Sequence, residues 1–455
     1  MDKENIYGVF EYKGKEYPFA LDGQILTIPQ APFQFVKDFD EASQIEAIQG
    51  VTSNNRDIVF VGCDVIENGR TPFSTEVKLT ILGYILLESE IDQFDEIRLQ
   101  SEAINVFYSP RFAYDVEWTE DKIGTMGIKL RDRALYKREC QCKIDGEDIQ
   151  IGLDISIHFN LSLTEDKLGS ANTVFSMSFP EKKKPYDILK YYLYVRDFLE
   201  FVNFRKDIPL KEILLFDKTD TGKYRKCGRA VIFQPDSSGY QPNLVKSITY
   251  IDITAECFPA LFQQISEKRL KDARNPFLCP ESRSDDKTVD ASKWLNTAIC
   301  FEGEFNEAFP NYRAKNDLSF HQAKSLLLST IDDAVEESGF GINHKQNKNL
   351  KSFKNLIERS DTTIKQKFEV SQANYREETA DAINNICRIC GISEDVDLAE
   401  EYASYRNHTA HGEIRRPELV DVATYRILRC FIYTINLKKA NVPTERIQDI
   451  IKRMF

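Results

Sequence analysis

The spacing of apolar residues changes along this chain of 455 residues, and that change constrains its fold more than any other feature. Up to about residue 180, short segments alternate apolar with polar residues or are rich in β-branched residues, which is typical of strands. Beyond about residue 290, apolar residues recur at the spacing of helices. The sequence therefore predicts an α+β protein in which a β-rich, sandwich-like N-terminal region is followed by an all-α helical bundle.

The chain divides into three predicted parts. A β-rich domain covers residues 1–180, a mixed α/β extension covers residues 181–285, and a helical domain covers residues 291–455. The linker before the helical domain is expected at Asn275–Ala291, which is polar and contains two prolines. The expected strands are Ile58–Cys63, Glu76–Leu87, Ile149–Phe159, Val174–Phe179, Ile213–Phe216 and Arg229–Phe233. The expected helices are Pro185–Phe204, Phe258–Leu270, Leu318–Glu337, Asn349–Arg359, Thr362–Cys390, Val396–Arg406 and Pro417–Lys439.

The formal net charge is −12, but it is unevenly distributed. Residues 291–455 carry 23 Lys and Arg against 24 Asp and Glu, so almost all of the acidic excess lies in residues 1–290. Residues 411–455 carry nine basic residues against five acidic ones. An acidic surface disfavours binding of nucleic acid over the whole protein, so any such site is expected to be local and near this basic C-terminal segment.

No segment of the sequence is predicted to cross a membrane. The longest apolar runs are far shorter than the roughly 20 residues of a membrane-spanning helix, and the N-terminus lacks the apolar stretch of a secretory signal. The ten cysteines are therefore expected to be reduced thiols in the cytoplasm. Cys387 and Cys390 form a C-x-x-C pair, but a structural zinc site needs four ligands, so buried thiols are favoured there.

The segment from Tyr402 to Gly412 carries the most informative chemistry in the sequence. Arg406 and His411 are five residues apart and lie where a predicted helix ends before Gly412. Arginine binds phosphate oxygens through its planar guanidinium, and histidine can donate or accept a proton near neutral pH. The alternative without any chemistry is that Arg406 caps the end of the helix and that His411 is an ordinary surface residue.

The six residues from Arg406 to His411, with the sequence Arg-Asn-His-Thr-Ala-His, resemble the Arg-polar-x3-His signature of HEPN domains. The order of a strand-rich region and a helical domain is similar to that of ApeA-type anti-phage proteins. The resemblance implies a metal-independent endoribonuclease that needs no cofactor, acts as a homodimer through its helical domain and serves in abortive infection. It also implies an RNA substrate, of which transfer RNA is one candidate, and a phage-derived trigger.

The resemblance assigns roles to the residues of this segment. His411 is the expected general acid or base, Arg406 the clamp on the phosphate, and Asn407 the residue that orients either of them. The residues expected to flank the site or contact RNA are His408, Arg415 and Arg416. One motif supplies one His and one Arg, so a two-fold dimer would supply two of each. The apolar surface of the helix Pro417–Lys439 is wide enough for a core face and part of a dimer interface.

Two other functions remain open at this point. The helical domain could be a non-catalytic binding module beside a β-rich domain that senses a ligand. Acidic residues could instead hold Mg²⁺ in a metal-dependent nuclease, although the sequence alone does not bring carboxylates from different elements together. In the favoured hypothesis the β-rich region regulates the ribonuclease as a sensor, and its acidity argues against a direct role in gripping RNA.

Overall fold

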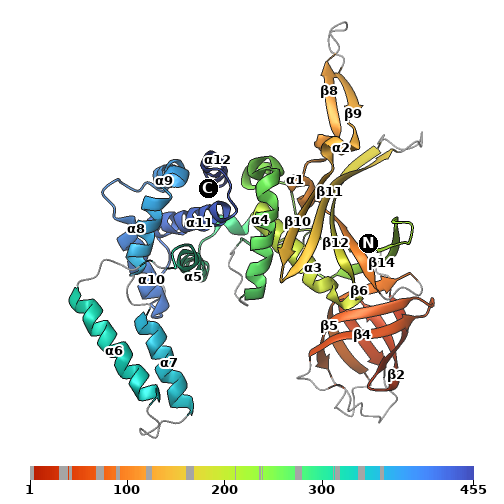
Figure 1. Cartoon of the computed structure of the whole chain (residues 1–455), viewed down its shortest axis with the longest axis horizontal. Coiled ribbons are helices and arrows are strands. Elements are labelled where there is room, and N and C mark those ends of the chain that lie inside the picture. Colours follow the sequence, from red (N-terminus) through yellow and green to blue (C-terminus); the bar gives the residue numbers. More distant parts are fainter. Residues whose placement is uncertain are drawn as a thin grey trace. The chain divides into compact units, whose positions relative to one another are not determined.

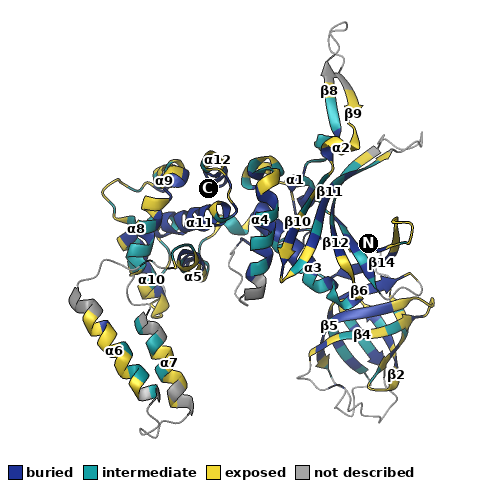
Figure 2. Ribbon diagram, in the orientation of Figure 1, coloured by how far each residue is buried: buried dark blue, intermediate teal, exposed yellow. Residues whose placement is uncertain are grey.

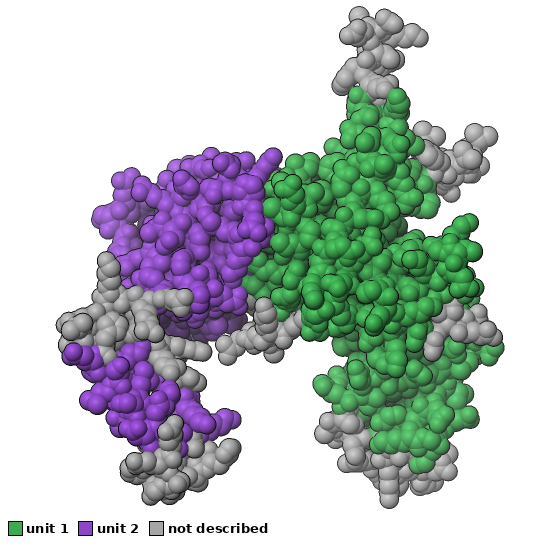
Figure 3. Space-filling model, viewed as in Figure 1, with its two compact units in different colours: residues 1–274, 279–285 green, residues 275–278, 286–455 purple. Residues whose placement is uncertain are grey.

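The computed structural model contains two compact units (Figure 3). The N-terminal unit comprises residues 1–274 and 279–285, and the C-terminal unit comprises residues 275–278 and 286–455. The further boundary expected at residue 180 stays a prediction. The structure describes residues 5–29, 39, 44–67, 76–88, 93–118, 126–159, 169–210, 212–234, 237, 239–271, 279–310, 312, 318–336, 344–358, 363–413 and 415–455.

The first six strands form a closed barrel (Figure 1). They are β1 (Ile6–Tyr12), β2 (Lys15–Asp22), β3 (Ile25–Pro29), β4 (Gln44–Thr52), β5 (Asp57–Glu67) and β6 (Glu76–Leu87). Pairing of β6 with both β3 and β5 closes the ring β6-β3-β2-β1-β4-β5. Alternate side chains point inward and fill the barrel, among them Phe10, Phe19 and Phe60. The predicted sandwich-like arrangement is therefore wrong, because these strands close on themselves and do not form two facing sheets.

Strand β6 also belongs to an open sheet. Its residues 83–87 pair with β14 (Tyr224–Ile232), while the same stretch still pairs with β5. Beyond β14 the sheet continues in the order β13 (Glu212–Lys218), β7 (Phe94–Gln100), β12 (Gly169–Lys183), β11 (Glu147–Phe159) and β10 (Arg138–Ile144). Barrel and open sheet thus form one continuous sheet of 12 strands. All six strands expected from the sequence are confirmed.

Helices cover one face of the open sheet. They are α1 (Glu102–Phe107), α3 (Ile188–Asn203) and α4 (Tyr250–Lys271). The ring of Phe175 on β12 lies 5.5 Å from that of Phe262 on α4, measured between centroids, and Phe179 lies 4.3 Å from Tyr191 on α3. Side chains alternate across a strand, so the even-numbered residues of β12 between these phenylalanines face away from the helices. The opposite face of the sheet is consequently polar.

A two-stranded hairpin extends from the open sheet (Figure 1). It consists of β8 (Tyr114–Trp118) and β9 (Met126–Leu130), and the short helix α2 (Arg133–Tyr136) follows it. Directly opposed residues share a face, so Tyr114 with Leu130 and Val116 with Ile128 form an apolar face. Val116 and Ile128 are exposed. At the base of the hairpin, the backbone N–H of Arg131 donates to the carbonyl oxygen of Ala113 (2.9 Å).

The C-terminal unit is helical. Its helices are α5 (Ala291–Ala308), α6 (Leu318–Glu336), α7 (His344–Glu358), α8 (Ile364–Asn374), α9 (Arg376–Cys390), α10 (Leu398–Ala410), α11 (Leu419–Lys439) and α12 (Thr444–Met454). Helix α11 packs against α5, α9, α10 and α12, whereas α6 and α7 pack against each other. Figure 2 shows α11 as buried over most of its length. The coarse prediction of a β-rich region followed by a helical region is confirmed.

Several helix boundaries differ from the sequence prediction. The helix expected at Thr362–Cys390 is two helices, α8 and α9, which meet at Tyr375. No glycine or proline marks this break; the Tyr375 ring is buried there, 6.0 Å from that of Phe309. Helix α11 begins after Pro417, with Glu418 as its capping residue. Helices α5 and α12 are absent from the expected set, although both lie in the segment predicted to be helical.

The expected linker at Asn275–Ala291 is not a free connection in its described part. Cys279 and Pro280 are buried in the N-terminal unit. The Cys279 thiol donates to the carbonyl oxygen of Glu200 (3.3 Å). The backbone N–H of Lys206 donates to the carbonyl oxygen of Pro280 (3.0 Å). From Asp286 onward the chain belongs to the C-terminal unit, where the Asp286 carboxylate accepts from Arg429 (2.9 Å).

We expect Trp294→Ala to lower the free energy of unfolding of the C-terminal unit by about 3–5 kcal/mol. The indole is fully buried, and its Nε1 donates to the backbone oxygen of Asp421 (2.9 Å), so truncation leaves a cavity and an unpaired carbonyl. Urea unfolding followed by circular dichroism measures the loss. The control is Leu419→Ala, which removes an exposed side chain and should change stability by less than about 0.5 kcal/mol. Equal effects of the two changes would contradict this account of the core.

Candidate functional site

Helix α10 carries the motif and continues through it. Asp397 caps its start, because the carboxylate accepts from the N–H groups of Ala399 and Glu400 (both 3.1 Å). The end is a Schellman motif. The backbone N–H of Gly412 donates to the carbonyl oxygen of Thr409, and the backbone N–H of Glu413 donates to the carbonyl oxygen of His408. The expectation that the helix ends at Arg406 is therefore wrong. Its end is set by Gly412, whose φ of 87° is the left-handed conformation that glycine adopts without strain.

One face of α10 packs into the core of the C-terminal unit. Tyr402 and Tyr405 are fully buried, and their rings lie 5.7 and 4.7 Å from that of Trp294 on α5. Burial raises the pKa of Tyr402 well above its usual value, and the negative charge of Glu302 raises it further. These aromatic contacts fix the rotation of α10 about its own axis, and they set the direction in which the motif residues project.

Arg406 forms an ion pair with Glu302 of α5. Its Nε lies 3.0 Å from Oε1 and its Nη2 3.4 Å from Oε2, so both carboxylate oxygens are engaged. The Arg406 side chain is 25% exposed and that of Glu302 18%, so the pair lies at the edge of the core. Within the described part of the chain, Nη1 of Arg406 makes no hydrogen bond. The guanidinium is thus held in one orientation with donors left over for a further oxygen ligand.

Glu302 is a site residue that the sequence does not indicate. It lies 104 residues before Arg406, in a helix that the motif gives no reason to consider. A lone glutamate in an amphipathic helix has the pattern of an ordinary solvated residue. The packing of α5 and α10 against each other and against α11 brings the carboxylate to the guanidinium.

Of the remaining motif residues, Thr409 is buried and the others lie on the surface. Asn407, His408 and His411 are exposed, and His411 is the C-cap residue of α10. Nδ1 of His408 lies 2.5 Å from Oε2 of Glu413, so a side chain just beyond the helix engages this imidazole. Among the described residues, the imidazole of His411 has no hydrogen-bond partner. His411 is therefore accessible to a substrate, as an acid or base must be.

Arg406 and His411 project in different directions from α10. At 3.6 residues per turn, five residues correspond to about 140° around the axis and about 7.5 Å along it. In the described structure no hydrogen bond joins the two side chains. The fold thus pairs Arg406 with Glu302 and leaves His411 at the exposed helix end.

Arg415 and Arg416, the expected phosphate contacts, differ in their surroundings. Nη1 of Arg415 lies 2.9 Å from carboxylate oxygens of both Glu418 and Asp421, and its guanidinium lies 4.7 Å from the centroid of the Tyr405 ring. Arg415 therefore ties the segment after α10 to the start of α11. Arg416 is exposed, and within the described residues no ion pair engages it, so of these two it is the better candidate for a phosphate contact.

Much of the basic C-terminal segment is neutralised within the unit. Among the described residues, at least five of its nine basic residues form ion pairs: Arg415 with Glu418 and Asp421, Arg429 with Asp286, Lys438 with Glu378, Lys439 with Glu304 and Glu307, and Lys452 with Asp381. The formal excess of positive charge therefore overstates the attraction this segment exerts on phosphate groups.

The apolar surface of α11 belongs to the core of its own chain. The six apolar residues on which the expected interface rests are all buried: Ile427, Leu428, Cys430, Phe431, Ile432 and Ile435. The prediction that this surface also contributes to a dimer interface is wrong, since neighbouring helices cover it on every side. A second copy would have to dock elsewhere on the unit.

The cysteines have no metal-like surroundings in the described structure. Cys387 and Cys390 lie on α9, and Cys140 and Cys142 lie on β10; all are free thiols. Burial raises the pKa of the thiols of both pairs, to about 12 for Cys140 and Cys142. Within the described ranges, no three His, Cys, Asp or Glu side chains are grouped so that they could hold a metal ion.

Comparison with protein-family models, with curated proteins and with solved structures finds no match to this chain. The similarity to HEPN domains therefore stays an inference from the six motif residues and the order of the two units. None of the helices in the described ranges combines the length and apolar content that crossing a membrane requires.

We expect Gly412→Ala to lower the free energy of unfolding by about 1–2 kcal/mol, because a side chain at φ 87° is strained. The matched control is Gly303→Ala in α5. There the added methyl group meets no atom within 4 Å and the backbone is helical, so stability should rise by up to about 1 kcal/mol. Thermal unfolding of both variants shows whether each change lowers or raises the stability. A loss of stability in both would contradict the assignment of Gly412 as the residue that ends α10.

Proposed function

We propose that this protein is a metal-independent endoribonuclease of the HEPN type, with its active site at the C-terminal end of α10. The observation that carries the proposal is the arrangement at this helix end: Glu302 holds the guanidinium of Arg406 in place, and the imidazole of His411, five residues further along, is exposed. Both groups belong to a helical unit that follows a strand-rich one, as the family resemblance implies.

The chemistry of RNA suits these two side chains. RNA carries a 2′-hydroxyl group beside each phosphate, which can attack the phosphorus and expel the 5′-oxygen of the next nucleotide. This step needs a base for the hydroxyl proton, an acid for the leaving oxygen and positive charge near the pentacoordinate phosphate. In the proposal His411 transfers the proton and Arg406 binds the phosphate oxygens. Asn407 orients the side chain of either His411 or Arg406. The product is a 2′,3′-cyclic phosphate.

A second copy of the chain completes the proposed site. One motif supplies one imidazole and one guanidinium, which project about 140° apart from α10. Acid and base catalysis need two proton-transferring groups, and a two-fold axis near the helix end would supply the second His411. In the proposal the two-fold contact uses the exposed end of α10 and its neighbours, since the six apolar residues of α11 are buried within the chain.

The proposal extends to the biological setting that the resemblance implies. The protein would act in the cytoplasm in abortive infection, with transfer RNA as one candidate substrate. The N-terminal unit would regulate the nuclease in response to a phage-derived trigger. This assignment leaves the acidic N-terminal region outside the RNA-binding surface.

The test is RNA cleavage in the presence of EDTA. We expect wild-type protein to cleave mixed RNA to products that end in 2′,3′-cyclic phosphate, and we expect Arg406→Ala and His411→Ala to lower the rate by about 10²–10⁴-fold. Arg388→Ala on α9 removes an exposed arginine outside the site and serves as the control. Gel analysis of end-labelled RNA with mass spectrometry of the ends provides the readout.

Each alternative has its own outcome in this assay. Cleavage that requires added Mg²⁺ would replace the proposal with a metal-dependent nuclease. If wild-type protein binds RNA but cleaves none, even in extract from phage-infected cells, the helical unit is a binding module. Equal activity of wild type and both motif variants would place any nuclease site elsewhere.

Glu302 is proposed as a positioning residue that acts through Arg406. We expect Glu302→Ala to lower the cleavage rate by about 10–100-fold, because it releases the guanidinium from its fixed orientation. Glu302→Gln keeps one oxygen acceptor for Arg406 and should restore part of the rate. Single-turnover kinetics at saturating RNA separates this effect from weaker binding.

The control for Glu302 is Glu307→Ala on the same helix, α5, because it removes an ion pair with Lys439 of α11 and does not affect Arg406. It should leave the cleavage rate unchanged. If Glu302→Ala speeds cleavage instead, the carboxylate blocks the phosphate site in the resting protein, and its role is inhibitory.

A further inference from the structure

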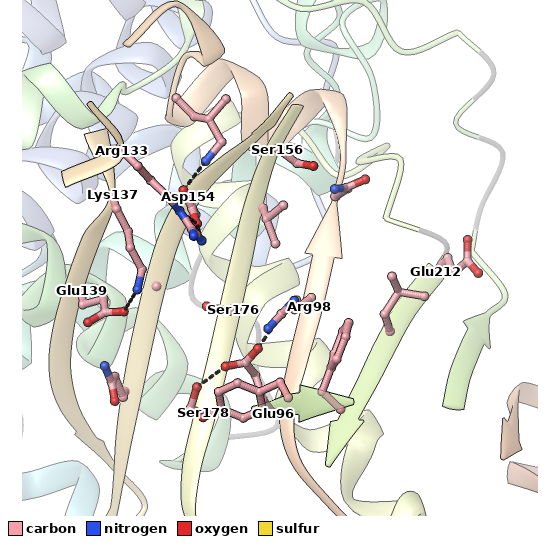
Figure 4. A pocket seen from close by; sticks show the side chains of 18 residues that line it. Glu96, Arg98, Arg133, Lys137, Glu139, Asp154, Ser156, Ser176, Ser178 and Glu212 are labelled. Carbon is pink, nitrogen blue, oxygen red and sulfur yellow. Dashed lines mark hydrogen bonds and ion pairs between the residues drawn. The ribbon is translucent and has the colours of Figure 1, made fainter. Parts of the chain in front are cut away.

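The polar face of the open sheet contains a hollow of about 840 Å³ (Figure 4). Its floor and walls come from β10, β11, β12, β7, β13 and β14, and residues of α2 and the turn after it close one side. Pockets for small molecules typically have volumes of about 300–1,000 Å³. This hollow therefore has room for a ligand much larger than a single phosphate ion, and it lies entirely within the N-terminal unit.

Small side chains create the depth of the hollow. Gly152, Ser176 and Ser178 lie on its floor, on the two central strands β11 and β12. A Cβ atom on Gly152 would lie 2.4 Å from Oγ of Ser176, so no larger residue fits there without a shift. The opposite faces of these strands bear large apolar residues that contact the helices. The polar face is thus hollowed where a sheet would otherwise carry longer side chains.

A fixed arginine stands beside this floor. Arg98 on β7 pairs in register with Ser176, and its guanidinium lies 3.9 Å from the centroid of the Phe216 ring. Its Nε donates to Oε1 of Glu96 (2.5 Å), and Oε2 of Glu96 accepts from Ser178 (2.7 Å). Within the described residues, neither Nη atom of Arg98 has a partner. Stacking and the ion pair hold the guanidinium, while its two outer nitrogens stay free for an oxyanion.

A second pair faces the floor from the side of α2. The Arg133 guanidinium is bound to the carboxylate of Asp154, with Nε 3.0 Å from Oδ2 (Figure 4). In both pairs the cation is the more exposed partner: 35% against 7% for Arg98 and Glu96, and 67% against 20% for Arg133 and Asp154. The two carboxylates are therefore less exposed than the arginines. The hollow is also lined by Glu139, which pairs with Lys137, and by Glu212, which pairs with Arg229.

We propose that this hollow binds a small phosphate ester of nucleotide size. Arginines on two sides of a small-residue floor match a ligand that carries anionic oxygens, and the guanidinium geometry suits phosphate. The volume requires an organic group in addition, and Tyr224 at the wall offers an aromatic surface for it. The inference is independent of the proposed nuclease, because it concerns residues 96–224 alone.

The experiment measures binding to the full-length protein by isothermal titration calorimetry at physiological ionic strength. The probes are AMP, ribose 5-phosphate, inorganic phosphate and adenosine. We expect AMP to bind more tightly than inorganic phosphate, and adenosine to bind at least about tenfold more weakly than AMP because it lacks the charged group. Arg98→Gln should weaken AMP binding at least about tenfold, and Arg133→Gln should weaken it measurably.

The control is Arg56→Gln, which removes an exposed arginine in the turn between β4 and β5 of the barrel and should leave the affinity unchanged. Arg133 is exposed on a short helix, so its variant tests the proposal even if Arg98→Gln fails to fold. The proposal is overturned if no phosphate ester binds, if adenosine binds as well as AMP, or if inorganic phosphate binds as tightly as AMP. Equal weakening by Arg56→Gln would also overturn it.

Discussion

Helix α11 is the element on which the C-terminal unit depends. From Ala423 to Leu437 nearly every side chain is buried, polar ones included, and such a helix is stable only when other helices surround it. Helices α5, α9, α10 and α12 meet this requirement. Because α5 and α10 pack on α11 and directly on each other, Glu302 reaches Arg406. The candidate site therefore depends on the same packing that buries α11. The buried indole of Trp294 contacts both α10 and α11 from its place on α5.

In the N-terminal unit, one long strand, β6, joins the barrel to the open sheet. β6 closes the barrel and then continues as part of the open sheet, so two architectures share one set of backbone hydrogen bonds. The barrel fills its own interior with buried side chains. Helices bury one side of the open sheet, and polar and charged residues occupy the other. The hollow described above lies on this polar side of the open sheet.

Sequence periodicity predicted six of the 14 described strands and most of the longer helices, because the alternation of β11 and the apolar spacing of α3 are local properties. Sequence periodicity did not predict the features that depend on contacts between distant parts of the chain. The break at Tyr375 follows from tertiary packing of one ring, since no glycine or proline marks it. Barrel closure depends on the pairing of β5 with β6. A strand shows the same alternation of apolar and polar residues in a barrel and in a sandwich, so this alternation does not distinguish the two folds. The motif located Arg406 and His411, but Glu302 lies 104 residues away and has no sequence signal of its own. The hollow likewise combines residues from six strands.

The hairpin β8–β9 has a consequence for how this chain can change over evolutionary time. The chain enters and leaves the ribbon at one point, where Ala113 and Arg131 are hydrogen-bonded, and neither strand takes part in the 12-stranded sheet. Its length and outer residues can therefore vary without shifting the register of any other strand. Insertions concentrate where they disturb the fold least. Related chains can thus diversify this ribbon rapidly, as a replaceable appendage, while the sheet that supports it stays constant.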